Sequence, residues 1–223
     1  MVSHACSKNL TRWVSLFCLF IFCLGICRHF FKKYYQALQI HKHGYWQGAN
    51  VSTLHYFDPS LADALVHFFT EEKAQSIVDF GCGMGDYVRV LLANHFDCQG
   101  YDGNPDTKVL SQGFCDVLDL SEPVNLSKHY DWVVSLEVGE HLPPEHETVF
   151  MDNLHRHNIH GIVLSWAVIG QGGYGHFNEQ NNDYIKQKMA QYGYINDLEA
   201  ESILRNAASL EWFKNTIMVF RKI

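Results

Sequence analysis

A glycine-rich turn between an apolar segment and an amphipathic segment is the feature that most constrains this chain. Residues 77–80 read Ile-Val-Asp-Phe, residues 81–86 read Gly-Cys-Gly-Met-Gly-Asp, and residues 87–92 read Tyr-Val-Arg-Val-Leu-Leu. The first segment predicts a buried strand and the last predicts a helix. Because the alternating glycines carry no Cβ, backbone N–H groups and the N-terminus of the helix can come close to a ligand. The sequence therefore predicts a strand–turn–helix unit that binds a ligand at its turn.

Two common kinds of glycine-rich loop do not fit this turn. A phosphate-binding loop needs Lys followed by Ser or Thr after its last glycine, but Asp86 and Tyr87 stand there instead. The G-x-G-x-x-G spacing of dinucleotide-binding folds is absent as well. A second acid, Asp102, ends the segment 98–102 and comes 21 residues after Gly81. In doubly wound α/β folds a carboxylate at this place binds ribose hydroxyls, so Asp102 is predicted to do the same.

The glycine turn and the second acid together resemble a known enzyme family. Residues 79–85 read D-F-G-C-G-M-G and residues 101–103 read Y-D-G. These resemble the first two motifs of the class I S-adenosylmethionine-dependent methyltransferases, and the resemblance runs from about Val51 to the C-terminus. It implies an α/β fold with a Rossmann-like, seven-stranded, mostly parallel sheet, helices on both faces and a C-terminal antiparallel hairpin. A glycine turn in some other α/β protein is the alternative.

The same resemblance assigns parts of S-adenosylmethionine to particular residues. The amino-acid end lies on the glycine turn, with Asp79 fixing the turn or meeting the ammonium group, and the ribose diol lies at Asp102. The adenine amino group needs an acceptor at the end of the third strand, where Asp116 is favoured and Asp119 competes with it. The residues predicted to bind the cofactor are Asp79, Gly81, Cys82, Gly83, Gly85, Asp102, Asp116 and Val117.

Acidic and histidine side chains follow the expected fourth strand, where residues 137–141 read Glu-Val-Gly-Glu-His. If this segment is helical, the i, i+3, i+4 spacing places Glu137, Glu140 and His141 on one face. The cofactor is already activated, so methyl transfer needs a base only where the acceptor must lose a proton. The predicted catalytic residues are Glu137, His141 and His176.

The E-x-x-E-H pattern also resembles two metal-dependent branches of the family, the small-RNA 3′-terminal 2′-O-methyltransferases and the ubiquinone-pathway O-methyltransferases. The first branch uses one further histidine downstream, and His176 is the counterpart here. Carboxylates and imidazoles in this pattern could hold Mg²⁺ or Mn²⁺. In many small-molecule methyltransferases a Glu-His pair at this place instead stabilises the turn or acts as a base. We favour the metal-free interpretation and keep the cation as an alternative.

A second glycine-rich stretch, residues 170–176, follows the expected fifth strand. Acceptors bind on that side of this fold, so we expect an acceptor-site loop, with a mobile linker as the alternative. Five other histidines are expected at the surface, namely His41, His43, His155, His157 and His160.

The remaining elements are expected from periodicity and from turn signals. Asp58 and the proline after it predict a helix start, because they suit the N-cap and the first turn. Helices are predicted over 59–70, 145–157, 182–192 and 197–207. Strands are predicted over 113–115, 131–136 and 161–166, and the closing hairpin over 210–213 and 216–220.

An uncharged apolar run, residues 13–27, lies between Arg12 and Arg28. Its 15 residues are fewer than the roughly 20 that a spanning helix needs, although the residues after it could extend it. We expect an uncleaved, single-pass membrane anchor, because basic rather than small residues follow the run; a buried core helix is the alternative. The expected domains are a tail with this anchor (1–33), a linker or cap (34–57) and a cytosolic methyltransferase domain (58–223).

Charge and cysteine content limit the class of protein further. The net charge of −7 argues against an extended nucleic-acid surface, so nucleic acid is not an expected partner. Seven cysteines without paired or zinc-like spacing predict reduced thiols. The sequence therefore predicts an enzyme that moves a methyl group to an oxygen or nitrogen of a small or lipid-like acceptor. The alternatives are a metal-dependent RNA 3′-end methyltransferase and a catalytically silent binding module.

Overall fold

The computed structural model describes residues 39–48, 51 and 54–223. The expected membrane anchor, residues 13–27, and the expected boundary at residue 33 lie outside these residues. Among the residues that the structure describes, no helix is both long and apolar enough to cross a membrane.

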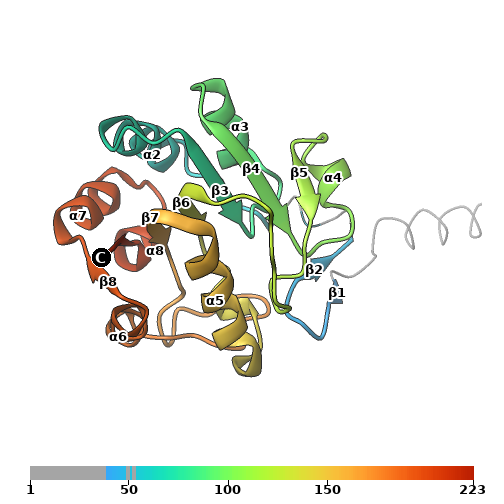
Figure 1. Cartoon of the computed structure of the whole chain (residues 1–223). Coiled ribbons are helices and arrows are strands. Elements are labelled where there is room, and N and C mark those ends of the chain that lie inside the picture. The colour runs from blue at the N-terminus through green and yellow to red at the C-terminus, as the bar shows by residue number, and fades with distance from the viewer. Residues whose placement is uncertain (1–38, 49–50, 52–53) are drawn as a thin grey trace, which may run out of the picture. The chain divides into compact units, whose positions relative to one another are not determined.

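A seven-stranded sheet with the order β5-β4-β3-β6-β7-β9-β8 organises the chain (Figure 1). Its strands are β3 (Ser76–Phe80), β4 (Asp97–Asp102), β5 (Cys115–Val117), β6 (Tyr130–Ser135), β7 (Asn158–Leu164), β8 (Tyr194–Asn196) and β9 (Met218–Lys222). The α-helices are α2 (Pro59–Glu71), α3 (Asp86–Ala93), α4 (Thr107–Leu110), α5 (Glu147–His157), α6 (Asn182–Gln191), α7 (Leu198–Ala207) and α8 (Glu211–Thr216). The described residues also form two 3₁₀ turns, η2 (Gly139–His141) and η3 (Pro144–His146). A small hairpin consists of β1 (Gln39–Ile40) and β2 (Trp46–Gln47).

The sheet is mostly parallel, which confirms the predicted fold class. β3 pairs in parallel with β4 and β6. β5 pairs in parallel with β4, and β7 pairs in parallel with β6. β9 is antiparallel to both of its neighbours, β7 and β8. β3 is therefore the point from which the crossovers run in opposite directions, and such a point leaves a crevice at the carboxyl ends of the strands.

Both faces of the sheet are covered by helices, because successive strand residues point to opposite faces. On one face Ile77 belongs to a core cluster with Leu65 of α2 and Leu91 of α3. On the other face Val78 belongs to a cluster with Phe150 of α5, together with side chains of α6. This burial fixes the register of β3, and it fixes where the glycine turn begins.

The start of α2 confirms the predicted helix signal. Asp58 is the N-cap, and its Oδ1 accepts a hydrogen bond from the backbone N–H of Leu61 at 3.1 Å. Its Oδ2 accepts from the N–H groups of Ser209 and Leu210 at 2.7 and 2.8 Å. Burial alone would raise the pKa of Asp58, but the hydrogen bonds from Leu210 and Leu61 hold that pKa below its ordinary value.

The antiparallel C-terminal strands are present, but the predicted residues of the closing hairpin are partly wrong. β9 pairs with β8, a strand that the sequence did not reveal, whereas the expected strand 210–213 lies largely in helix α8. The helix places Phe213 and Thr216 three residues apart on one buried face, at 3% and 0% exposure.

Two smaller predictions also need correction. The strand expected at 113–115 lies at Cys115–Val117, because residues 112 and 113 take positive φ angles and turn the chain. His157 is buried rather than at the surface, since its Nδ1 lies 2.7 Å from the carbonyl oxygen of Asn153 and its Nε2 accepts from the N–H of Leu126. His160 is exposed, as expected.

Candidate active site

A cavity of about 350 Å³ lies at the carboxyl ends of β3, β4 and β6. This volume is within the range of roughly 300–1,000 Å³ that small-molecule sites occupy. The cavity is lined by the glycine turn, the end of β4, the loops after β5, β6 and β7, the β1–β2 hairpin and α8.

The glycine turn takes the conformation that its sequence predicts. Gly81 and Gly83 have φ angles of +85° and +54°, in the left-handed region that favours glycine. A Cβ on Gly81 would come within 2.2 Å of the Val138 side chain, and one on Gly83 within 2.8 Å of the His55 ring. Gly85 is the N-cap of α3, so the first turn of this helix starts beside the cavity. Gly81, Cys82 and Gly83 all line the cavity.

Asp102 joins the end of β4 to the glycine turn. Its Oδ2 accepts a hydrogen bond from the N–H of Gly83 at 3.0 Å, and its Oδ1 accepts from the N–H of Asn104 at 2.9 Å. The side chain lines the cavity, as its predicted role requires.

Asp79 is buried near the end of β3 and also lines the cavity. Burial and then the charge of Asp102 raise the pKa of Asp79 to about 8. Asp79 is therefore largely protonated at neutral pH, and a cation bound beside it would favour its ionised form.

The residues predicted to bind adenine differ in whether they line the cavity. Asp116 and Val117 lie in β5, but they are not among the described residues that line the cavity, and Asp116 pairs with Lys108 at 3.2 Å on the exposed surface. Asp119, the competing acid, does line the cavity. Its Oδ1 accepts from both the N–H and the hydroxyl of Ser121, at 3.0 and 2.7 Å.

Glu137 does not share a helix face with Glu140 and His141. Its φ angle is +54°, and only the segment from Gly139 to His141 forms a 3₁₀ turn. The carboxylate of Glu137 accepts hydrogen bonds from Gln171 at 2.7 Å and from the hydroxyl of Thr216 at 3.0 Å. Burial raises the pKa of Glu137, although these hydrogen bonds oppose the shift. Glu137 thus connects the loop 170–176 to α8.

Glu140, His141 and His176 lie together. Each offers one ligand atom, and these atoms all lie within 4.8 Å of one another. Glu140 is fully buried, and neither carboxylate oxygen has a hydrogen-bond partner of ordinary geometry. Burial and then the charge of Glu137 raise the pKa of Glu140 well above its usual range; nearby backbone N–H groups, including that of Ala167, oppose this only in part.

The two histidines of this group are oriented by hydrogen bonds from Nδ1. Nδ1 of His141 lies 3.1 Å from the carbonyl oxygen of Gly175, so Nδ1 donates and Nε2 keeps its lone pair. Nδ1 of His176 lies 3.0 Å from a carboxylate oxygen of Glu179 and donates a hydrogen bond to it. Burial, followed by the charge of His176, lowers the pKa of His141 to about 4. His141 is therefore a neutral hydrogen-bond acceptor at pH 7.

The loop 170–176 lines the cavity through Gln171, Gly172, Gly173, Tyr174 and His176. Beside it, the cavity wall is apolar and aromatic. The rings of Tyr56 and Trp212 meet edge to face with centroids 5.6 Å apart, and Leu54 lies on the same wall. Tyr56 is 64% exposed, so this wall reaches the protein surface.

Sequence reasoning missed the contribution of the β1–β2 hairpin and of Glu179. Tyr45 and Trp46 line the cavity, and a Cβ on Gly103 would come within 2.5 Å of the Tyr45 ring. The aromatic content of 34–57 suggested a cap, but strands of two residues leave no periodic pattern. Glu179 follows the glycine loop without a motif of its own.

Comparisons with known proteins agree with this geometry. A protein-family model described as "Methyltransferase domain" matches residues 54–164. The chain is 32% identical over 126 residues to the probable chloroplastic tocopherol O-methyltransferase of Oryza sativa subsp. japonica. That match covers 49% of this chain and 34% of the rice protein, so the chain spans about a third of that relative's length.

Solved methyltransferase structures share the fold. Magnesium protoporphyrin IX methyltransferase from Synechocystis PCC 6803 with bound SAH has a TM-score of 0.54 at 17% identity, covering 73% of this chain and 81% of that one. The methyltransferase domain of bacterial CtHen1 has a TM-score of 0.54 at 17% identity, covering 74% and 98%. With the glycine turn, Asp102 and the sheet order, these similarities show that residues 54–164 belong to the methyltransferase-domain family and that the chain has the fold of the class I S-adenosylmethionine-dependent methyltransferases.

Proposed function

We propose that this cavity binds S-adenosylmethionine and that the protein transfers its methyl group to an oxygen or nitrogen of a small or lipid-like acceptor. The observation that carries the proposal is that one cavity is lined both by Asp102 with the glycine turn and by Glu137, His141 and His176. Cofactor-binding and candidate catalytic groups therefore lie within reach of a single bound pair of reactants.

The polar groups of the cavity match the parts of the cofactor. The cationic amino group would favour the ionised form of Asp79, whose pKa is raised to about 8 without it. The carboxylate of Asp102, already oriented by two backbone N–H groups, would accept from the ribose hydroxyls. The stretch 119–121 lines the cavity next to the end of β5, which supports an adenine subsite there.

The chain's own residues would position the acceptor and receive its proton. Bound in the cavity, S-adenosylmethionine supplies a methyl group on a sulfonium, so no further activation of the methyl donor is needed. His141 keeps a lone pair on Nε2 and can accept a hydrogen bond from the hydroxyl or amine of the acceptor. Glu137, held by Gln171 and Thr216, keeps the loop 170–176 next to this group.

The apolar wall supports the class of acceptor. Leu54, Tyr56 and Trp212 would cover a hydrophobic ring or chain, and the exposed edge of Tyr56 gives such a molecule a path from the surface. The rice relative is named for tocopherol and the Synechocystis enzyme for magnesium protoporphyrin IX, which are both largely apolar molecules. We further propose that residues 13–27 attach the protein to a membrane, with residues 58–223 as a cytosolic catalytic domain close to lipid-like acceptors.

A metal-dependent RNA 3′-end methyltransferase is the second candidate. The buried carboxylate of Glu140 favours it, because that group has no partner of ordinary geometry and lies beside the imidazoles of His141 and His176. Glu140, His141 and His176 would hold the cation, and one oxygen with two nitrogens suits Mn²⁺ better than Mg²⁺. The cation would act as a Lewis acid on the acceptor hydroxyl. Against this candidate, Glu137 is engaged elsewhere and the chain carries a net charge of −7.

Calorimetry and labelling can test the proposed function. We expect S-adenosylmethionine to bind the intact chain, and an apolar metabolite extract to acquire label from the methyl-labelled cofactor. Labelling of RNA ends instead, in a manner that requires Mn²⁺, would favour the second candidate. Failure of the cofactor to bind would contradict both candidates and favour a silent binding module.

A further inference from the structure

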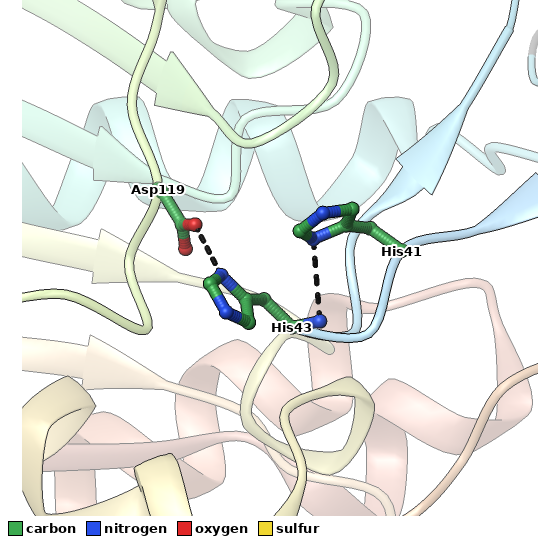
Figure 2. Close-up of side chains that lie close together, drawn as sticks. All are labelled: His41, His43 and Asp119. Atoms are coloured by element: carbon green, nitrogen blue, oxygen red, sulfur yellow. Dashed lines mark hydrogen bonds and ion pairs between the residues drawn. The ribbon is translucent and has the colours of Figure 1, made fainter.

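A second group of metal-ligating side chains lies where the β1–β2 hairpin meets the loop after β5. Figure 2 shows that His41 and His43 come from the hairpin turn and that Asp119 faces them from the loop. Each residue offers one ligand atom, and these atoms lie within 4.8 Å of one another. We propose that His41, His43 and Asp119 bind a transition-metal ion of the Zn²⁺ type, which fastens the hairpin over the cofactor cavity.

The donor set selects the class of metal. Two imidazole nitrogens and one carboxylate oxygen suit Zn²⁺ and similar borderline ions, whereas Mg²⁺ and Ca²⁺ prefer sites made of oxygen atoms. All three residues are only partly buried, so water can reach the ion and complete its coordination.

The ligands are held in place by their neighbours. Ser121 donates both its N–H and its hydroxyl to Oδ1 of Asp119, which leaves Oδ2 to face Nδ1 of His43 at 2.6 Å. The ring of His41 stacks on Tyr45 with centroids 4.4 Å apart and an interplanar angle of 17°. Such outer contacts orient ligands before an ion arrives. The His146 ring lies 5.1 Å from the His43 ring and is the next nitrogen donor nearby.

The simpler interpretation is an ion pair between His43 and Asp119 alone. In that case the 2.6 Å contact is a hydrogen bond and His41 has no part in it. A metal would displace the shared proton and would need His41 as well. His41 is therefore the residue that distinguishes the two interpretations.

The position of the group links it to the cavity. His43, Gly44, Tyr45 and Trp46 all line the cavity, and Asp119 lines it from the opposite segment. An ion held by His43 and Asp119 would keep Tyr45 packed over Gly103, next to Asp102. Metal and cofactor should then favour each other's binding. This coupling rests on the proposed function, whereas the metal site itself does not.

The test is a titration of the chelator-treated full chain with Zn²⁺ by calorimetry, and with Co²⁺ by visible absorbance. We expect micromolar binding in the parent protein and a loss of at least tenfold in affinity in His41→Ala and in Asp119→Asn. His160→Ala, which changes an exposed histidine, should bind as the parent does. Each titration is repeated in a His176→Ala background, so that binding at Glu140, His141 and His176 is counted separately.

Two outcomes would overturn the proposal. The first is that the His176→Ala protein binds no Zn²⁺. The second is that adding His41→Ala to it leaves its Zn²⁺ affinity unchanged. Melting temperature gives a second measurement, which remains useful if a variant is less stable. Zn²⁺ should raise the melting temperature of His160→Ala but not that of His41→Ala. Cofactor affinity is then measured with and without Zn²⁺. If S-adenosylmethionine binds in neither state, the proposed function fails while the metal titration still decides the site.

Discussion

Nδ1 of His176 lies 3.0 Å from Oε1 of Glu179. The same carboxylate also accepts hydrogen bonds from the N–H groups of Gly170 and Gly172, at 2.7 Å each. One side chain thus holds both ends of the glycine loop and orients a histidine in the cavity. These hydrogen bonds, that from His176 first, lower the pKa of Glu179. Glu179 is therefore a positioning residue for the acceptor side of the cavity.

Replacing Glu179 with Gln should loosen this loop. An amide cannot accept at both of its terminal atoms, so at least one of the three contacts is lost, and a hydrogen bond to a charged group is worth about 1.5–3 kcal/mol. We expect faster amide hydrogen exchange over 170–176 and roughly tenfold slower methyl transfer, with unchanged cofactor affinity. Glu145→Gln, at an exposed position, is the control. Unchanged exchange in Glu179→Gln would show that the loop is held by other contacts.

Replacing Asp102 with Ala should weaken cofactor binding. The change removes the acceptor for the ribose hydroxyls and also releases the N–H of Gly83 from the turn. A loss of about 1.5–3 kcal/mol for each charge-assisted hydrogen bond is the upper limit. Calorimetry with S-adenosylmethionine measures it, with exposed Asp63→Ala as the control. Parent-like affinity in Asp102→Ala would mean that the ribose lies elsewhere.

The raised pKa of Asp79, about 8, predicts how stability depends on pH. Between its ordinary pKa and about 8 the folded cofactor-free protein binds more protons here than the unfolded chain, so stability falls as pH rises. At roughly 1.4 kcal/mol per pKa unit, the loss is on the order of a few kcal/mol. In denaturant unfolding, the stability of Asp79→Asn relative to the parent should therefore be greater at pH 8 than at pH 5. Equal pH profiles for the two proteins would be inconsistent with a buried, titrating Asp79.

Added Mn²⁺ offers a test of the Glu140 group that does not depend on knowing the acceptor. If Glu140, His141 and His176 hold the ion, Mn²⁺ should raise the melting temperature of the parent but not that of Glu140→Gln. Without metal, Glu140→Gln should cost little stability, because burial disfavours the charged form of this acid. No shift in the parent, or an equal shift in Glu140→Gln, would contradict a metal site at Glu140, His141 and His176.

Much of the fold follows from local patterns in the sequence. The apolar run ending in Phe80 and the alternating glycines from Gly81 determine a buried strand and a tight turn, because few other conformations satisfy both. Asp58 and the proline after it mark the start of α2 for an equally local reason. Asp102 could be placed at the cavity because parallel strands end at a common edge.

The errors arise where tertiary contacts decide the structure. Glu137 takes a positive φ and is held by Thr216, a residue 79 positions away, which no local spacing reveals. The segment 210–213 is predicted as a strand, yet burial of Phe213 and Thr216 on one face favours helix α8. His157 accepts its hydrogen bond from Leu126, 31 positions earlier, so its burial could not be read from its own helix.

The buried carboxylate of Asp58 has a consequence for synthesis of the chain. It accepts hydrogen bonds from the N–H of Leu61 in its own helix and from the N–H groups of Ser209 and Leu210, about 150 positions later. Until residues 209 and 210 have left the ribosome, a growing chain cannot give this carboxylate its full set of hydrogen bonds, and burying it without them costs free energy. The first helix of the described domain therefore reaches its final state only after residues 209 and 210 have been synthesised.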